Sequence, residues 1–482
     1  MPIIGWGRFI LKKGDEPVHI QNRVAILRGK FQQSIGLPFA EILPESKIEA
    51  ALKAEGISYR KRLFCPFVTL WAWLSQVLDK DKSCKNALSR VISYVVAAGQ
   101  TPPSTDSSAY CKARKRIKAG FLLCLMRLTG KHLHEQPEPA VLWCGRRAVV
   151  FDGSRLTMAD TEMNQAKYPQ PKSQAKGCGF PAGRIVCGFS LATGAVLDAV
   201  ISSLSFGEVS LFRQLYVHLE AGDVALGDRI FGTFADICLL FARGVDSAFR
   251  LHGSRKTDFR KGKRLARWDH IVQWVKPKQC PKGLKRKLFD QLPQRILLRE
   301  VRFHIARKGF RTEDVTLVTT LLDAKLYTRI DLAQLYRLRW HAEIDLKHLK
   351  TTMQMEHLPS KTPEMVVKDF YIHLLAYNLI RALQLEASKQ HCVDPLSLSF
   401  CATIQHVSSF SSLLAHASAA QRLYEYTQLI FLVSTEKLPN RPNRVEPRAV
   451  KRRPKAYPRL CQPRKQLKRK LMNDRYSPRA AA

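Results

Sequence analysis

Three features that define other classes of protein are missing from this sequence of 482 residues. The twelve cysteines form no C-x-x-C pair and no Cys/His cluster with zinc spacing, which indicates reduced cysteines and no zinc finger. No apolar run approaches the roughly 18 residues of a membrane span, and the N-terminus lacks the apolar segment of a secretory signal. These absences predict a cytoplasmic protein with no membrane partner.

Acidic residues are also scarce, because 40 Asp and Glu stand against 79 Lys and Arg, for a formal net charge of +39. Such an excess repels itself unless a polyanion lies against it, and double-stranded nucleic acid is the natural candidate. A basic but inert surface, or electrostatic binding without catalysis, is the alternative. The hydrophobic content of 45% allows a large core, so we expect a globular chain of about two to four domains.

Composition and hydrophobic pattern divide the chain into seven segments and predict a mixed α/β fold class. In order, they are an unassigned extension at 1–60, a helical DNA-binding domain at 61–138, the first part of an α/β domain at 139–252, an inserted β-rich module at 253–312, the second part of the α/β domain at 313–394, a helical region at 395–436 and a basic tail at 437–482. The tail holds 16 Lys or Arg and seven prolines, which predicts a disordered arm that contacts DNA by charge.

The helical segment contains a basic cluster. Helices are expected at 67–78 and 83–98, and a long third helix opens at Ser104 or Thr105. This third helix carries Lys112, Arg114 and Arg116, which we expect to contact duplex DNA. A solvated charged face is the alternative.

One predicted helix at residues 331–350 carries a polar stripe beside an apolar one. Tyr336, Arg339, Glu343 and Lys350 follow one another at intervals of three, four and seven residues. At about 100° per residue, these side chains fall within an arc of roughly 60°. A carboxylate beside two cations and a phenol suits metal-assisted chemistry on a phosphodiester, because Glu binds a hard cation and the others hold phosphate oxygens. An ordinary charged face is the alternative.

Two further acids follow predicted strands. Asp152 comes directly after the apolar run 148–151, and Asp228 follows the strand-like run 224–227. Ligand sites of α/β sheets gather at such strand ends, although either residue taken alone is commonly a turn residue. With Glu343 they form an Asp, Asp, Glu set. Two-metal phosphoryl transfer needs acids from separate segments to converge on two Mg²⁺ ions about 4 Å apart.

These residues resemble the insertion sequence 4 family of bacterial DDE transposases. The resemblance rests on Asp152-Gly-Ser, Gly227-Asp228-Arg-Ile-Phe and Tyr336-x2-Arg339-x3-Glu343-x6-Lys350. It extends to Trp274-x-Lys-Pro, Val318-Thr-Thr-Leu-Leu-Asp323, Lys361-Thr-Pro-Glu-Met365, Leu374 to Arg381 and Lys451 to Lys455, and covers about residues 105–460. Nothing in the acidic triad departs from the family pattern, and the resemblance is silent on residues 1–60.

The resemblance implies a ribonuclease-H-like catalytic domain that a β-strand insertion interrupts before the third acid. Asp152, Asp228 and Glu343 would be the catalytic residues and the ligands of two Mg²⁺ ions, for which Mn²⁺ can substitute. The other three residues of the helical motif would hold the phosphates of the terminal DNA.

The family also implies a role for a tryptophan, because members can form a DNA hairpin in which a flipped base stacks on an indole of the insertion. Trp274 is our preferred counterpart and Trp268 the reserve. A core-packing indole is an equally good interpretation of either residue.

The implied activity is that of a transposase. It binds the terminal inverted repeats of its element, cleaves the ends and joins the freed 3′-hydroxyls to target DNA. Because both ends must be held together, we expect a homodimer on DNA, and neither a nucleotide cofactor nor a covalent enzyme–DNA link is needed. Two alternatives stay open, namely a ribonuclease-H-like nuclease or resolvase without strand transfer, and a catalytically inactive DNA-binding regulator.

Overall fold

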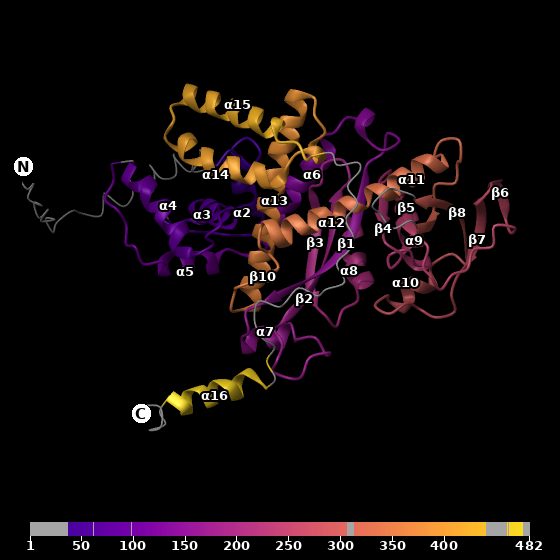
Figure 1. Ribbon diagram of the computed structural model, residues 1–482, viewed down its shortest axis with the longest axis horizontal. Coiled ribbons are helices and arrows are strands. Elements are labelled where there is room, and N and C mark those ends of the chain that lie inside the picture. The colour runs from indigo at the N-terminus through magenta and orange to yellow at the C-terminus, as the bar shows by residue number, and fades with distance from the viewer. Residues whose placement is uncertain are drawn as a thin grey trace, which may run out of the picture. The chain divides into compact units, whose positions relative to one another are not determined.

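The computed structural model describes residues 37–60, 62–97, 99–305, 313–439, 460 and 462–475. They fall into two compact units (Figure 1): unit 1 comprises residues 1–117 and 410–422, and unit 2 comprises residues 118–409 and 423–482. This division differs from the boundary expected at residue 138. The long third helix is broken into α5 (Ser108–Arg116) and α6 (Ala119–Glu135), because Ile117 between them is extended, with ψ 129°. As a result, α5 belongs to unit 1 and α6 to unit 2.

Unit 1 is helical and is built around one apolar helix. Its remaining helices before residue 117 are α2 (Glu45–Ala54), α3 (Pro66–Leu78) and α4 (Cys84–Ala97). Every residue of α3 from Phe67 to Val77 is buried, so α3 is surrounded by the other helices rather than lying at the surface. Part of the segment expected to be unassigned is therefore helical at α2, whereas residues 1–36 lie outside the described residues.

Unit 2 contains one ten-stranded mixed sheet with the order β3-β2-β1-β4-β5-β9-β8-β7-β6, to which β10 is added beside β1. Its strands are β1 (Ala148–Met158), β2 (Ala182–Ser190), β3 (Val196–Ser203), β4 (Val224–Gly227), β5 (Asp246–Arg250), β6 (Lys263–Ala266), β7 (Asp269–Val275), β8 (Arg295–Ile305), β9 (Glu313–Thr319) and β10 (His357–Leu358). Strands β1, β4 and β5 are parallel to one another, and β2 and β3 return antiparallel. The mixed α/β class is confirmed.

The segment expected to be an inserted module is rich in strands, as predicted, but it extends the central sheet. Strand β9 pairs antiparallel with β5, and β8, β7 and β6 follow in order. The short helix α10 (Arg286–Asp290) lies between β7 and β8 in the chain. Continuous backbone pairing therefore joins this segment to the strands that carry Asp152 and Asp228. Residues 306–312 lie outside the described part of the chain.

After β1 the chain also forms helices, several of which contact the sheet (Figure 1). They are α7 (Glu162–Lys167), α8 (Glu208–Leu215), α9 (Phe234–Phe241), α11 (Arg329–Leu338), α12 (Trp340–Lys347) and α13 (Pro363–His391), with α14 (Phe400–His416) and α15 (Ala419–Thr435) after them. Asn378 of α13 fixes this helix to β3, because its amide accepts from Val196 N at 2.8 Å and donates to Val196 O at 2.9 Å. Gly130 of α6 lies so close that a Cβ there would be 2.1 Å from the same oxygen.

The C-terminal tail differs in part from the disordered arm that we expected. Residues Arg464–Arg475 form helix α16, whose first turn is bonded to unit 2 through Arg464 N and Gly177 O at 3.1 Å. Lys465 pairs with Glu162 at 3.0 Å. Most of residues 440–461 and residues 476–482 lie outside the described residues, so the rest of that expectation stays a prediction. No helix among the described residues is long and apolar enough to cross a membrane.

Candidate active site

Strand pairing brings the two aspartates together. Phe151 of β1 and Gly227 of β4 form the last residue pair between these parallel strands, so Asp152 and Asp228 follow it side by side. Neighbouring strands lie about 4.8 Å apart. Strand β1 does not end at this point, as we expected, but continues to Met158 because β2 pairs with it as far as Thr157. Asp152 therefore lies just beyond the part of β1 that pairs with β4, but within the part that pairs with β2.

Each aspartate is oriented by the backbone. Asp152 Oδ1 accepts from Gly153 N at 2.8 Å, and Asp228 Oδ1 accepts from Arg229 N at 2.7 Å. Within the described residues neither carboxylate forms an ion pair, and both are only half-buried. The carboxylates therefore remain available as ligands.

The helix that carries Glu343 is not the single helix that we predicted. Helix α11 starts with a capping box of Thr328 and Asp331 and ends at Leu338, and α12 follows after Arg339. Residues 348–352 then form a π-helical turn, in which Met353 N bonds to His348 O at 2.9 Å. A π turn widens the helix and changes the angle per residue, so Lys350 leaves the face expected from a regular 3.6-residue repeat.

The four residues of the helical motif consequently make different contacts. Arg339 Nη2 lies 3.0 Å from Glu343 Oε1. The ring of Tyr336 is buried, and its centroid lies 5.5 Å from the guanidinium carbon of Arg339. Lys350 instead reaches β1, where its Nζ donates to Ser154 Oγ at 3.1 Å. Since Ser154 is two residues after Asp152, and side chains alternate along a strand, both lie on the same face of the sheet.

The charges of the three acids act on one another. Burial raises the pKa of the Asp152 carboxyl to about 6, and the negative charges of Glu343 and Asp228 add to the rise. The Gly153 N–H and the Arg339 guanidinium oppose it. For Arg339, burial lowers the pKa, but Tyr336, Glu343 and Asp228 outweigh it and raise the pKa overall. The electrostatics thus join residues from β1, the end of β4 and α12 in one site.

This donor set suits a hard divalent cation, because it offers carboxylate oxygens from three separate segments. In the described part of the chain, however, no three Asp, Glu, His or Cys side chains are gathered as a finished metal site. Glu343 Oε1 accepts from Arg339 Nη2 at 3.0 Å, and a carboxylate has a second oxygen that can bind a cation.

Sequence reasoning missed Arg250. It ends β5, and Phe249 before it pairs with Gly227, so Arg250 stands beside Asp228 on the side opposite to Asp152. The charge of Arg250 also opposes the rise in the pKa of Tyr336 that burial causes. The sequence signal that could have found it is the short run 246–250, which predicts a strand that ends in a cation. In the sheet this strand is the second neighbour of β1.

The structure does not support our preferred stacking tryptophan. Trp274 is buried, its indole Nε1 donates to Glu300 Oε1 at 2.8 Å, and the Arg255 guanidinium covers its ring at 3.7 Å. Because the indole is 5% exposed and Arg255 covers its ring, a base cannot stack on it in this structure. Trp274 has this position because it faces inward on β7 and joins the main hydrophobic cluster.

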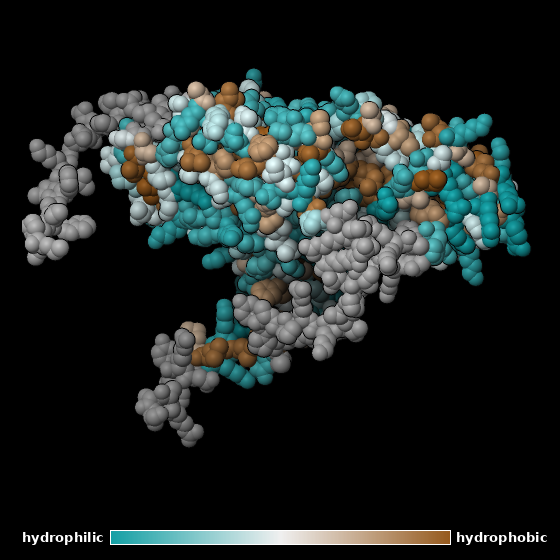
Figure 2. Space-filling view, turned by 45° about the horizontal axis from the view of Figure 1, so that its top comes forward, coloured by the Kyte–Doolittle hydropathy of each residue, from teal (hydrophilic) through white to brown (hydrophobic). Residues whose placement is uncertain are grey.

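Trp268, the reserve, is 40% exposed and sits at the β6–β7 turn with a left-handed φ of 65°. Its ring lies 5.5 Å from Phe259 and 5.5 Å from the Arg302 guanidinium. Exposed cations flank it at Arg264 and Arg267. In Figure 2 the surface at this end of the molecule, where β6 and β7 lie, is mostly hydrophilic.

The basic cluster of α5 is divided between surface and core. Lys112 and Arg116 are exposed, as a DNA-contacting role requires. Arg114 is buried, with its guanidinium 4.2 Å from the ring centroid of Trp73 and Nη1 3.1 Å from Cys84 Sγ. The expectation that Arg114 contacts DNA is therefore wrong for this structure, because its charge is held inside unit 1.

Comparisons with known proteins place this geometry in context. The family described as Transposase DDE domain matches residues 143–379, a range that contains all three acids. The transposase InsG for insertion sequence element IS4 of Escherichia coli (strain K12) is 26% identical over 431 residues, which is 86% of this chain and 91% of that protein. A solved piggyBac transposase synaptic complex with hairpin DNA covers 88% of this chain and 86% of its own, with 11% identity and a TM-score of 0.39. That score is too low to establish a common fold.

The matched domain and the converging acids define an enzyme that acts on DNA. Together, the matched domain and the relative support a DDE transposase of the insertion sequence 4 family. Enzymes of this family use divalent metal ions.

Proposed function

We propose that Asp152, Asp228 and Glu343 hold two Mg²⁺ ions, which Mn²⁺ can replace, and that the chain uses them to cleave and rejoin DNA at the ends of its own element. The observation that carries this proposal is that separate segments meet: the pairing of β1 with β4 sets Asp152 and Asp228 side by side, and the charge of Glu343 on α12 acts on Asp152. We also propose that strands β1 to β5, in the order β3-β2-β1-β4-β5, form the ribonuclease-H-like core and that residues 253–312 act as its insertion.

When bound, the metal ions would supply an activated nucleophilic oxygen and stabilise the leaving oxygen. The residues of the chain hold and orient the DNA strand. Lys350, fixed by Ser154 on β1, and Arg339, beside Glu343, place two cations next to the acids, where phosphate oxygens of the scissile strand would lie. The ring of Tyr336 packs against the Arg339 guanidinium, and we assign Tyr336 a positioning role because this ring is buried.

The reaction that suits this site has two stages. Water attacks the phosphodiester at each end of the element and leaves a 3′-hydroxyl, which then attacks a phosphodiester of target DNA. Because two ends must react together, we propose that the chain works as a homodimer on double-stranded DNA, in the bacterial cytoplasm. If cleavage passes through a hairpin, Trp268 is the indole whose exposure allows it to stack on a flipped base.

An integration assay tests the proposal. The full chain is incubated with supercoiled donor DNA that carries the ends of its element, with target DNA and Mg²⁺. Wild type should give integrated product, while Asp152→Asn, Asp228→Asn and Glu343→Gln should each abolish cleavage and keep end binding within about twofold. The matched control Asp323→Asn changes an exposed acid of the same unit and should leave the yield unchanged.

The products also separate the two rival functions. Nicked donor without joining would indicate a nuclease or resolvase, and binding without breakage by wild type would indicate a regulator. Retained turnover in any of the three site variants would remove that residue from the site.

A further inference from the structure

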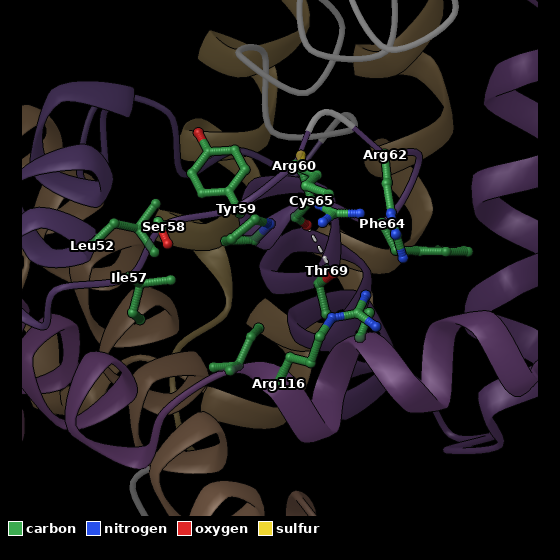
Figure 3. Close-up of a pocket in the computed structure, with 13 residues that line it drawn as sticks. Leu52, Ile57, Ser58, Tyr59, Arg60, Arg62, Phe64, Cys65, Thr69 and Arg116 are labelled. Carbon is green, nitrogen blue, oxygen red and sulfur yellow. Dashed lines mark hydrogen bonds between the residues drawn. The ribbon is translucent and has the colours of Figure 1, made fainter. Parts of the chain in front are cut away.

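Unit 1 contains a pocket that the active site does not use. It has a volume of about 290 Å³ and lies where the segment after α2, the start of α3 and the end of α5 meet. Figure 3 shows Arg60 and Arg62 on one side of it and Arg116 on the other. These three are the charged residues of the lining, which contains no acid. An anionic ligand is therefore favoured over a neutral or cationic one.

The floor of the pocket is apolar, and the Thr69 hydroxyl that lines it is already hydrogen-bonded. Leu52, Phe64 and Ile117 line it and are buried, with exposures of 3%, 8% and 4%. The hydroxyl of Thr69 donates to Cys65 O at 2.8 Å, the bond drawn as a dashed line in Figure 3. Simple backbone phosphate contact needs no such floor, so the ligand should combine an anionic group with an apolar one.

The rim carries the charge at the surface. Arg60, Arg62 and Arg116 are all exposed, and within the described residues none of them forms an ion pair. The 13-residue helix α3 begins at Pro66, which also lines the pocket, so the positive end of its dipole adds to the guanidinium charges. A phosphate at the rim would thus meet several donors.

We propose that this pocket binds one nucleotide of a DNA strand, unstacked from its neighbours, with the base in the hollow and the phosphate on the three arginines. The inference rests on the proposed function only in that the chain acts on DNA; it does not involve the acids. A free nucleotide has the same chemistry, and an acidic peptide with an apolar side chain is the rival. DNA is favoured because the net charge is +39 and exposed Lys112 continues the basic surface along α5 from Arg116.

Binding of short duplexes to the full chain, in EDTA, tests the proposal. Three fluorescent duplexes share one sequence and are fully paired, carry a one-nucleotide bulge, or carry an abasic bulge. Stacking and burial of one base is worth about a tenfold gain in affinity once unpairing costs nothing. Wild type should therefore bind the base-containing bulge about tenfold more tightly than the other two.

Two variants and a control link this preference to the pocket. Ser58→Trp places an indole on an exposed lining position and fills the hollow, and Arg60→Ala with Arg116→Ala removes two rim charges without touching the buried floor. Ser58→Trp should lose the preference for the bulged duplex and bind the paired one as wild type does. The arginine variant should lose the preference and bind all three duplexes more weakly. Lys85→Ala removes an exposed charge of α4 outside the pocket and should keep the full preference.

Several results would overturn the proposal. They are equal binding of the three duplexes by wild type, an unchanged preference in both pocket variants, and a preference that the abasic bulge shares. Displacement of the bulged duplex by an acidic hydrophobic peptide but not by millimolar AMP would reassign the pocket to a protein partner, whereas displacement by AMP supports a nucleotide site. Because this binding assay contains no metal, a negative result in it would not contradict the proposed transposase function. Loss of integration by the acid variants would likewise not contradict the preference for the bulged duplex.

Discussion

Replacing Asp152 by Asn should make the metal-free protein more stable at neutral pH while it destroys activity. Burial and two neighbouring acids raise the pKa of this carboxyl from its ordinary value of 3.8 to about 6. A tenfold change in proton affinity is worth about 1.4 kcal/mol, so the charged form costs folding up to about 3 kcal/mol above pH 6. The amide has nearly the same shape and carries no charge, so it removes this cost.

The sign of the pH dependence follows from the direction of the shift. The folded state holds the Asp152 proton more tightly than the unfolded state, so the wild-type contribution is most favourable below pH 3.8 and is lost as pH rises to about 6. Asp152→Asn should therefore raise the Tm of unit 2 by a few degrees at pH 8 in EDTA, and by much less at pH 4. Mg²⁺ should raise the Tm of wild type and not that of the variant.

A matched control carries the opposite sign. The carboxylate of Asp323 accepts from the backbone of Leu326 and Lys325, and these bonds lower its pKa. Asp323→Asn is the same chemical change in the same unit and should leave the Tm at pH 8 unchanged or slightly lower. The reasoning fails if Asp152→Asn lowers the Tm at pH 8 in EDTA, or if Mg²⁺ stabilises that variant as much as wild type.

Two further predictions concern residues that look alike in the sequence. Trp274→Ala should lower stability by about 3–5 kcal/mol because it empties a buried site, whereas Trp268→Ala should leave the Tm within a degree or two and weaken any hairpin intermediate on a gel. Arg114→Ala should lower the Tm of unit 1, because it removes the guanidinium packed on Trp73. Lys112→Ala should instead weaken DNA binding and reduce the slope of log affinity against log salt concentration by about one. A change in Tm without a change in DNA binding for Lys112→Ala would contradict this assignment.

The sequence predicted the strands and acids well where local pattern decides. The apolar runs before Asp152 and Asp228, and the motif spacing that pointed to Glu343, identified the three segments that the structure brings together. The sequence pattern could not predict where the helix departs from a regular 3.6-residue repeat. The π turn that moves Lys350 onto Ser154 depends on packing against β1, which no helical repeat reports.

Burial of charged and aromatic residues was the other failure. Arg114 and Lys112 lie in one basic run, yet α5 turns the first toward Trp73 and the second to solvent. Trp268 lies in the β6–β7 turn and is exposed, whereas Trp274 lies near the end of β7 and is buried. In each case the outcome is set by a partner distant in sequence, so pattern alone leaves both possibilities open.

The division of the chain has a consequence for its synthesis. Unit 1 contains residues 410–422 in addition to its N-terminal part, which ends at residue 117. In this late segment His416 stacks on Tyr94, with ring centroids 5.9 Å apart. A ribosome must therefore translate most of the message before the first helical unit has all of its parts. Prematurely terminated copies would lack that late segment, so full length is a condition for a finished unit at the N-terminus.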